Sequence, residues 1–198
     1  MSLTPWKKLG EPEVLAEGFS KQFIRQKFKD HNGKETNFYF QNQPAWSIVL
    51  PITKDNQVIL VKEYKQGANA IFEEIPGGTA DFKGEDPEVV MEKELLEETG
   101  YKPGKVISLG SGWINSRNST TNYYCFLALD CVKIQEPHPD RSEQFEHLTR
   151  PLKEWIKIMI AGEWVQWDAY VTLIRALPHL GIELKLDHLK NDNTIASR

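Results

Sequence analysis

The sequence predicts a mixed α/β fold in which strands fill the first part of the chain and helices follow. Three observations support this prediction. Apolar, β-branched runs separated by turn residues occupy much of the first 75 positions, a helix with both ends marked comes next, and two helical segments lie near residues 151–177. A chain of 198 residues without repeats or an obvious linker is expected to form one domain.

The first strands are expected to form an antiparallel β-hairpin. The runs Lys21 to Lys29 and Glu35 to Gln41 are joined through Asn32-Gly33, which is a strong hairpin turn signal. The later runs typical of strands are Trp46 to Thr53, Gln57 to Tyr64, Ile71 to Ile75, Lys105 to Leu109, Asn122 to Val132 and Phe145 to Arg150. The two helical segments after them are Pro151 to Ala161 and Val165 to Leu177.

The central helix is specified by local signals at both ends. Asp86 is a good N-cap, Pro87 fits the first helical position, and Gly100 can end the helix in a left-handed conformation. Apolar contacts are expected from four residues of this helix, Val89, Val90, Leu95 and Leu96. Its other face should point into a cleft.

Three carboxylates, Glu94, Glu97 and Glu98, share that polar face. Residues three and four apart are neighbours on a helix, so like charges there cost about 0.2–0.5 kcal/mol per pair, and a bound cation would remove this cost. Mg²⁺ prefers oxygen ligands and usually binds a substrate phosphate as well. Before the helix, Gly77 and Gly78 let the backbone approach a ligand closely and offer a carbonyl oxygen. The pattern suggests metal-assisted phosphate chemistry.

The series from Gly77 to Tyr101, GGTADFKGEDPEVVMEKELLEETGY, resembles the Nudix box, G-x5-E-x7-R-E-U-x-E-E-x-G-U with U aliphatic. The acidic residues that match are Glu85, Glu94, Glu97 and Glu98, followed by Gly100. The loop between Gly78 and Glu85 is one residue longer than the pattern, Lys93 stands where the family has arginine, and Tyr101 replaces the last aliphatic residue. Because lysine lacks arginine's planar fork, we expect slower chemistry rather than none.

The rest of the chain resembles the ADP-ribose and nucleoside diphosphate sugar pyrophosphatase branch of that family. The strand ending in VILVKEYK, the FEEIPGG segment and PLKEWIKIMIAGEW are similar to segments of this branch. The likeness implies an α/β/α sandwich with a mixed sheet in a Nudix hydrolase domain over residues 45–186. It also implies an N-terminal β region, residues 1–44, that forms a homodimer and contacts substrate, and it leaves residues 187–198 as a polar tail.

By the same resemblance, the chain is expected to hydrolyse the pyrophosphate bond of ADP-ribose or a nucleotide sugar into a nucleoside monophosphate and a sugar phosphate. Glu94, Glu97 and Glu98, with the Gly77 carbonyl, would hold Mg²⁺, with Mn²⁺ as an alternative. A loop glutamate would act as the base or bind another metal. In the segment DRSEQFEHL, Glu143 is favoured over Glu146 for this role.

Four residues are expected to contact substrate. Lys65 corresponds to a substrate-contacting arginine of the branch, and Glu74 is expected to lie near the metals. Lys93 could pair with phosphate or with the box carboxylates. Trp46 is a candidate for stacking on a nucleobase, with core packing as the equal alternative.

Charge and composition limit the classes of partner and the cellular location that are expected. A net charge of −4 gives no support for nucleic-acid binding, no apolar run approaches the length of a membrane span, and the start of the chain lacks the apolar core of a secretory signal, so a cytoplasmic location is expected. Two other functions stay open: a hydrolase of nucleoside triphosphates or coenzyme pyrophosphates, and a non-catalytic module that senses a nucleotide. The retained glutamates disfavour the sensing module.

Overall fold

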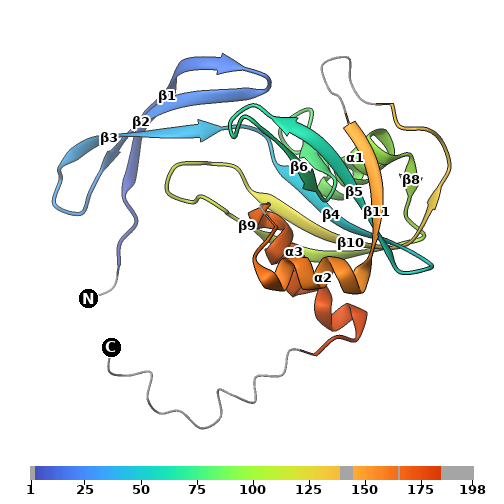
Figure 1. The fold of residues 1–198 in the computed structure, drawn as a ribbon. Coiled ribbons are helices and arrows are strands. Elements are labelled where there is room, and N and C mark those ends of the chain that lie inside the picture. Colours follow the sequence, from blue (N-terminus) through green and yellow to red (C-terminus); the bar gives the residue numbers. More distant parts are fainter. Residues whose placement is uncertain (1–2, 139–144, 165, 184–198) are drawn as a thin grey trace, which may run out of the picture.

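The computed structural model describes residues 3–138, 145–164 and 166–183. Its elements in chain order are β1 (Lys7–Gly18), β2 (Lys21–Lys29), β3 (Glu35–Asn42), β4 (Trp46–Thr53), β5 (Gln57–Lys65), β6 (Ala70–Glu74), β7 (Gly77–Thr79), α1 (Pro87–Thr99), β8 (Tyr101–Lys102), β9 (Lys105–Gly112), β10 (Tyr123–Lys133), β11 (Phe145–Pro151), α2 (Leu152–Ala161), α3 (Trp167–Ala176) and a 3-10 turn, η1 (Leu177–Leu180). The predicted mixed α/β architecture is confirmed (Figure 1).

The main sheet has eight strands and is mixed. Its path runs β11-β5-β4-β10-β8, with β6 beside β5, β7 beside β4 and β9 beside β10. β4 and β10 are parallel, whereas β5 pairs antiparallel with β4, β6 and β11. In Figure 1 the helices α2 and α3 lie on one side of this sheet and α1 lies on the other. The arrangement is the expected α/β/α sandwich.

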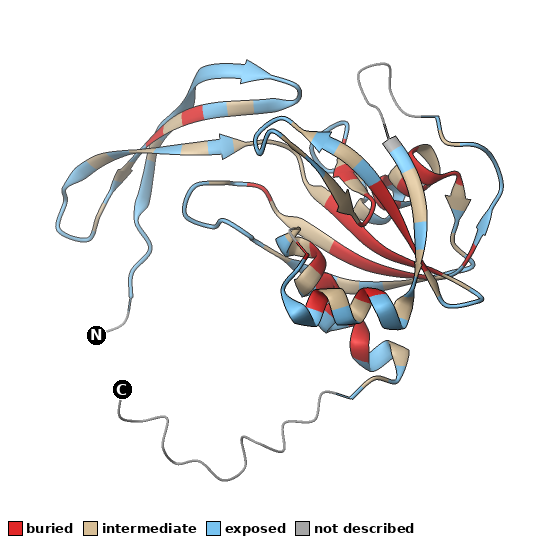
Figure 2. Ribbon diagram, viewed as in Figure 1, coloured by how far each residue is buried: buried red, intermediate tan, exposed pale blue. Residues whose placement is uncertain are grey.

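The apolar residues of the central strands alternate between two cores. Ile48 and Leu50 of β4 belong to the core beneath α2 and α3, whereas Val49 between them belongs to the core beneath α1. This alternation follows from the two-residue period of a strand. Figure 2 shows the buried residues gathered in these central strands and on the inner sides of the helices.

The central helix α1 begins and ends where the sequence predicts. The Asp86 side chain accepts a hydrogen bond from the backbone N–H of Glu88, Pro87 opens the helix, and Gly100 closes it with a φ of 77°. A Cβ at Gly100 would lie 2.1 Å from the backbone oxygen of Gln135, so both the positive φ and the close approach require glycine here.

One prediction for α1 is wrong. The helix buries Val90, Met91 and Leu95, but Val89 is 56 % exposed. Val89 lies on the solvent side of the helix, and Met91 occupies the inward position. Successive residues of a helix are rotated by about 100°, so the buried side of α1 includes Val90 and Met91 but not Val89.

The first three strands form a separate antiparallel sheet in the order β1-β2-β3. The predicted β2–β3 hairpin is confirmed, with Gly33 in its turn at a φ of 83°. The edge strand β1 was not predicted, because glycine and proline interrupt it. Its pairing with β2 shifts between Leu9 and Glu13, and there the buried Gln26 side chain donates hydrogen bonds to the backbone oxygens of Leu9 and Gly10. The Gln26 side chain thus provides hydrogen bonds to β1 carbonyl groups at the point where the β1–β2 pairing is irregular.

Backbone hydrogen bonds attach this N-terminal sheet to the rest of the chain. The N–H of Gln41 in β3 donates to the carbonyl of Asn118, and the N–H of Thr120 donates to the carbonyl of Gln41. The division of the chain at residues 44 and 45 stays a prediction, and residues 187–198 lie outside the described residues.

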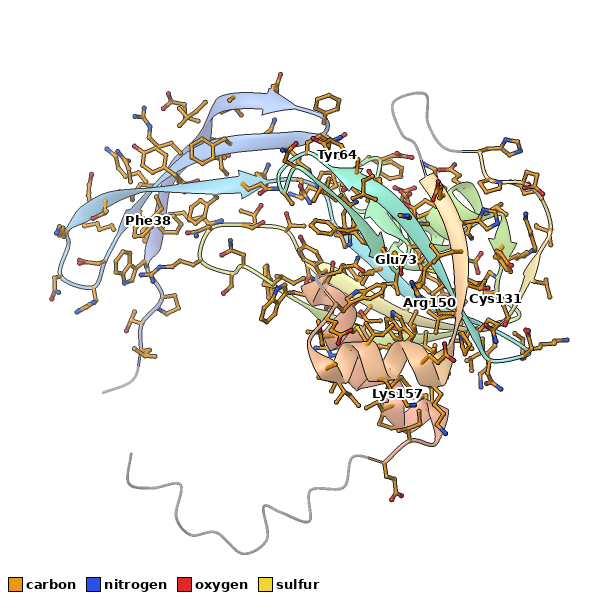
Figure 3. The ribbon with its side chains drawn as sticks, viewed as in Figure 1. Phe38, Tyr64, Glu73, Cys131, Arg150 and Lys157 are labelled. Carbon is orange, nitrogen blue, oxygen red and sulfur yellow. The ribbon has the colours of Figure 1, made fainter. Side chains whose placement is uncertain are left out.

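The last strand, β11, is fastened to β6 by an ion pair that crosses β5. Both carboxylate oxygens of Glu73 accept hydrogen bonds from the Arg150 guanidinium, at 2.7 to 2.9 Å (Figure 3). A bidentate pair of this kind has a fixed geometry. It holds the two strands that flank β5 in register with each other.

None of the helices in the described ranges is long and apolar enough to cross a membrane.

Candidate active site

The glycine pair after β6 is packed tightly against β4. Gly77 lies opposite Ile48 in the β7–β4 ladder, and a Cβ added to Gly77 would lie 2.6 Å from the backbone oxygen of Ser47. A Cβ added to Gly78 would lie 2.1 Å from Cδ of Glu94, so the Glu94 carboxylate lies directly over this glycine. The β4 backbone therefore requires glycine at position 77, whereas a side chain at position 78 would displace the Glu94 carboxylate.

Glu98 reaches the same glycines from the last turn of α1. Its Oε2 accepts a hydrogen bond from the Gly77 N–H at 3.3 Å, and the residue is only 7 % exposed. Burial, followed by the nearby charge of Glu94, raises the pKa of Glu98 well above its usual value, whereas Lys65 and the Gly77 hydrogen bond oppose this. The protein groups around Glu98 therefore disfavour its ionised form.

The side chain of Lys65 places a positive charge near Glu98. Its Nζ lies 2.5 Å from Glu63 Oε2 and 2.8 Å from Glu74 Oε2. Burial opposes the charge of Lys65, but the hydrogen bonds to these two carboxylates outweigh it and raise its pKa. Lys65 and Glu74, both expected to contact substrate, thus lie together and are paired with each other.

The predicted substrate contact Lys93 lies between the box glutamates and the loop before α1, and its role in substrate binding stays a prediction. Its Nζ pairs with Asp81 at 2.5 Å, and the Asp81 N–H donates to Glu85 at 2.7 Å. This hydrogen bond to Asp81 raises the pKa of Lys93. Lys93 therefore fastens the loop of residues 79–86, which we call the box loop, onto α1. Lys93 is thus paired with the loop that is one residue longer than the family pattern.

The predicted metal ligands are partly assembled. Glu94 and Glu98 converge on Gly77 and Gly78, but among the described residues no group of three or more His, Cys, Asp or Glu side chains is arranged to hold a metal ion. Glu97 lies on the same turn of α1 and contributes to the electrostatic environment of Lys93. The donors are hard carboxylate oxygens, and burial disfavours the charge of one of them, Glu98, by raising its pKa. This donor chemistry fits a divalent cation such as Mg²⁺.

The structure does not bring the candidate base Glu146 to these groups. Glu146 pairs with Lys62 across the β11–β5 ladder at 3.8 Å, and its side chain is 79 % exposed. Lys62 alternates with Glu63 along β5, so Glu146 and Glu63 point to opposite faces of the sheet. The preferred candidate, Glu143, lies outside the described residues.

Trp46, the candidate for base stacking, is packed against the core beneath α2 and α3. Its ring centroid is 6.3 Å from that of Tyr123, and its buried indole Nε1 has no hydrogen-bond partner in the structure. The next residue, Ser47, faces the other way and donates to the carbonyl of Pro87 at the start of α1. Trp46 therefore faces away from Glu98, and its role in binding stays a prediction.

Three residues of this region were not predicted: Glu63, Gln166 and Asp168. Glu63 could have been found, since it lies two positions before Lys65 on one face of a strand. Asp168 comes from the first turn of α3, and its pKa is raised to about 6 by burial and then by the charge of Glu74. We call the carboxylates Glu63, Glu74, Glu94, Glu98 and Asp168 around Lys65 the acidic cluster.

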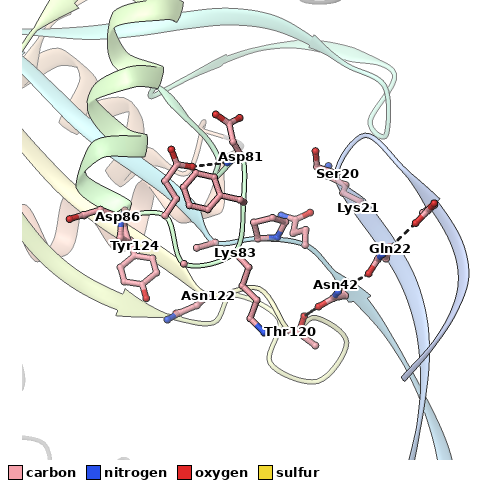
Figure 4. Close-up of a pocket in the computed structure, with 18 of the residues that line it drawn as sticks. Ser20, Lys21, Gln22, Asn42, Asp81, Lys83, Asp86, Thr120, Asn122 and Tyr124 are labelled. Carbon is pink, nitrogen blue, oxygen red and sulfur yellow. Dashed lines mark hydrogen bonds between the residues drawn. The ribbon is translucent and has the colours of Figure 1, made fainter. Parts of the chain in front are cut away.

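A groove of about 1300 Å³ lies between the β1–β2 turn and the box loop (Figure 4). Along one side, Asn42 Nδ2 donates to Gln22 and Thr120 Oγ1 donates to Asn42 Oδ1, at 3.0 and 2.7 Å. Lys83 from the box loop and Tyr124 from β10 line the other side. The N-terminal sheet and the box loop therefore share one polar groove.

The family of this chain follows from its match to a known domain. The NUDIX domain model matches residues 41–173. The chain belongs to the Nudix family. The match begins at the end of β3 and runs through most of α3, so it includes the glycine pair, the box glutamates and the first turn of α3. The expected Nudix hydrolase is confirmed.

Two curated relatives and one solved structure agree with this result. The Nudix chain is 28 % identical to the ADP-ribose pyrophosphatase of Bacillus subtilis (strain 168) over 133 residues, 67 % of this chain and 71 % of that protein. It is 31 % identical to the Saccharomyces cerevisiae (strain ATCC 204508 / S288c) ADP-ribose pyrophosphatase over 115 residues, 52 % of this chain and 49 % of that one. The crystal structure of an ADP compounds hydrolase matches its fold with a TM-score of 0.76 at 18 % identity, covering 91 % and 97 % of the two chains.

Proposed function

We propose that this Nudix hydrolase cleaves the pyrophosphate bond of a nucleoside diphosphate linked to a second moiety, either ADP-ribose or a nucleotide sugar, in a Mg²⁺-dependent reaction. The products are a nucleoside monophosphate and a sugar phosphate. The observation that carries the proposal is the buried Glu98 carboxylate, which lies with Glu94 against the Gly77-Gly78 backbone. The names of the two ADP-ribose pyrophosphatase relatives support the substrate class.

Glu94, Glu97 and Glu98 would hold the metal, with the Gly77 carbonyl as a further ligand and Mn²⁺ as an alternative ion. When bound, the cation would neutralise the phosphate oxygens and lower the pKa of a bound water. The burial of Glu98 supports this assignment, because it disfavours the charged carboxylate unless a cation lies beside it. A cation next to Glu98 would reverse that preference and keep the carboxylate ionised.

The chain's own residues would then position the substrate and move the proton. Water adds to one phosphorus, its proton passes to a carboxylate, and the bridging oxygen leaves with the other phosphate group. Glu143 is the proposed base, with Glu146 as the alternative. Lys65 supplies positive charge for the phosphates, and because it is already paired with Glu63 and Glu74, the substrate competes with these carboxylates for it.

Binding of the nucleoside and sugar is assigned to the N-terminal region together with Trp46. The groove that the N-terminal sheet shares with the box loop supports a role for residues 1–44 in substrate contact. We also propose a homodimer, because Phe23 and Tyr39 of the N-terminal sheet stack on each other 6.0 Å apart while each is 48 % exposed. A second copy would cover such aromatic surface. Light scattering that gives the mass of a single chain would contradict the dimer. The proposed location is the cytoplasm.

The test is a hydrolysis panel with Mg²⁺, Mn²⁺ or no added metal. The substrates are ADP-ribose, nucleotide sugars, dinucleoside polyphosphates, coenzyme A, NADH and nucleoside triphosphates, and mass spectrometry identifies the products. Two monophosphates from ADP-ribose or a nucleotide sugar are expected, with no turnover in a chelator. Release of pyrophosphate from triphosphates alone would favour the triphosphatase alternative, and ligand binding without any turnover would favour the sensing module.

A further inference from the structure

Gln166, the residue before α3, binds the main chain at the end of β6. The Ile75 N–H donates to Gln166 Oε1 at 2.9 Å, and Gln166 Nε2 donates to the Ile75 carbonyl at 3.4 Å. The two residues are 91 positions apart in the sequence, and Ile75 is only 1 % exposed. One amide side chain therefore satisfies both polar backbone groups of a buried residue, as a neighbouring strand would.

Ile75 lies in a short gap between two strands. β6 ends at Glu74 and β7 begins at Gly77, so only Ile75 and Pro76 connect them. Pro76 has no N–H, and its carbonyl accepts a hydrogen bond from the Val49 N–H at 3.0 Å. Gln166 thus holds the one residue of this connection that has both a donor and an acceptor.

The residues on either side of this connection belong to the acidic cluster or bind it. Glu74, just before Ile75, is paired with Lys65 at 2.8 Å, and the Gly77 N–H, just after Pro76, donates to Glu98 at 3.3 Å. A rotation of the Ile75 peptide would therefore turn Glu74 and Gly77 together. The first turn of α3 is close to the same groups, because the charge of Glu74 contributes to the raised pKa of Asp168.

We propose that Gln166 is a positioning residue of the active site, which holds the Ile75–Gly77 connection so that the Gly77 peptide meets Glu98. The inference rests on the proposed function for its catalytic consequence. Gln166 acts through the backbone of Ile75 and not by contact with substrate. Residues that orient metal ligands from behind typically change metal affinity or activity by about 10–100-fold when they are replaced.

The decisive variant is Gln166→Met, which keeps the length of the side chain and removes both hydrogen bonds. We expect kcat to fall by about 10–100-fold and the Mg²⁺ concentration for half-maximal activity to rise, with KM for ADP-ribose within about twofold of wild type. The matched control is Tyr170→Phe, which removes a hydrogen bond from Tyr170 to the Trp164 carbonyl in the same part of the chain without touching Ile75.

Two measurements do not need turnover. Calorimetry of Mg²⁺ binding should show weaker binding to Gln166→Met than to Tyr170→Phe, and hydrogen exchange should show faster exchange of the Ile75 and Gly77 amides in the metal-free variant. If wild type hydrolyses nothing in the panel, the proposed function fails, and these two measurements still decide the role of Gln166.

Equal Mg²⁺ affinity and equal amide exchange in Gln166→Met and Tyr170→Phe would overturn the proposal, as would a loss of activity that appears in KM alone. If Gln166→Met does not fold, Gln166→Asn decides, because it keeps an uncharged amide but is one methylene shorter, which draws the amide away from Ile75. A fall in kcat and a weaker Mg²⁺ affinity are then expected, and wild-type values for both would overturn the proposal.

Discussion

The two faces of the main sheet are built from the same strands but bury different chemistry. Beneath α2 and α3, Trp155 and Trp164 meet edge to face 5.5 Å apart inside an apolar core. Beneath α1, the apolar core ends near Leu95, and the carboxylate of Glu98 is buried one turn further on. Apolar burial lowers the free energy of the folded state on both faces, but on the second face burial also raises the pKa of a proposed metal ligand, Glu98.

This comparison predicts that stability and activity can be changed separately. Replacing Trp155, which is fully buried, with alanine should cost about 3–5 kcal/mol of unfolding free energy, because it removes apolar contacts and leaves a cavity. Denaturant unfolding measures the loss. Below the unfolding transition, kcat per folded molecule should stay near that of wild type. Ile160→Ala is the control, since Ile160 lies on the same helix but is 78 % exposed, and it should change stability by less than about 0.5 kcal/mol.

The matching change on the α1 face is Glu98→Gln. It keeps the shape of the side chain and removes its charge, so kcat should fall by about 10²–10³-fold, the size of effect seen when one preorganised electrostatic contact is lost. The metal-free variant should be at least as stable as wild type, because the fold disfavours the charged form of Glu98. Steady-state kinetics and thermal unfolding in a chelator measure the two effects.

Glu92→Gln is the control for that change, because Glu92 is an exposed residue of the same helix. It should leave both kcat and stability near the wild-type values. A Glu98→Gln variant that unfolds more easily without metal, or that keeps full activity, would show that the two faces do not differ in the way described.

A smaller effect is expected at Asp168, at the edge of the first face. Its folded pKa is raised to about 6, so its contribution to stability is present below about pH 4 and is lost as the pH rises towards 6. An asparagine at this position cannot ionise, so the Asp168→Asn variant does not lose this stability as the pH rises. The unfolding free energy of the variant relative to metal-free wild type should therefore increase by up to about 3 kcal/mol between about pH 4 and pH 7.

Urea unfolding at several pH values tests this, with Glu163→Gln as the control. Glu163 is an exposed acid of the α2–α3 connection, and its replacement should show no such trend. A flat pH profile for the difference between Asp168→Asn and wild type would contradict the assignment.

The sequence predicted elements whose causes are local. The caps of α1 and the Asn32-Gly33 turn depend on residues a few positions apart, and both were found. Strand β1 was not found, because its pairing depends on a side chain, Gln26, that replaces part of a ladder interrupted by glycine and proline. Local patterns cannot show that a distant side chain compensates for an unfavourable residue.

The residues of the candidate site likewise fall into two groups, those that local sequence patterns predicted and those that depend on contacts between distant segments. Glu94 and Glu98 were predicted from their spacing on one helix, and the structure brings them to the glycine pair. Gln166 was missed because its partner is 91 residues away and is a backbone segment, which leaves no residue-type signal. Lys65 was predicted as a substrate contact, but its pairing with two carboxylates depends on how β5 and β6 align.

Gly78 adds a different kind of constraint. Its φ is not among the positive values in the described chain, so backbone conformation alone would accept other residues there. The space for a side chain at position 78 is occupied by the carboxylate of Glu94. The two positions are therefore coupled: a side chain at position 78 would push the Glu94 carboxylate away from the Gly77-Gly78 backbone, so the fold would persist while a proposed metal ligand is displaced.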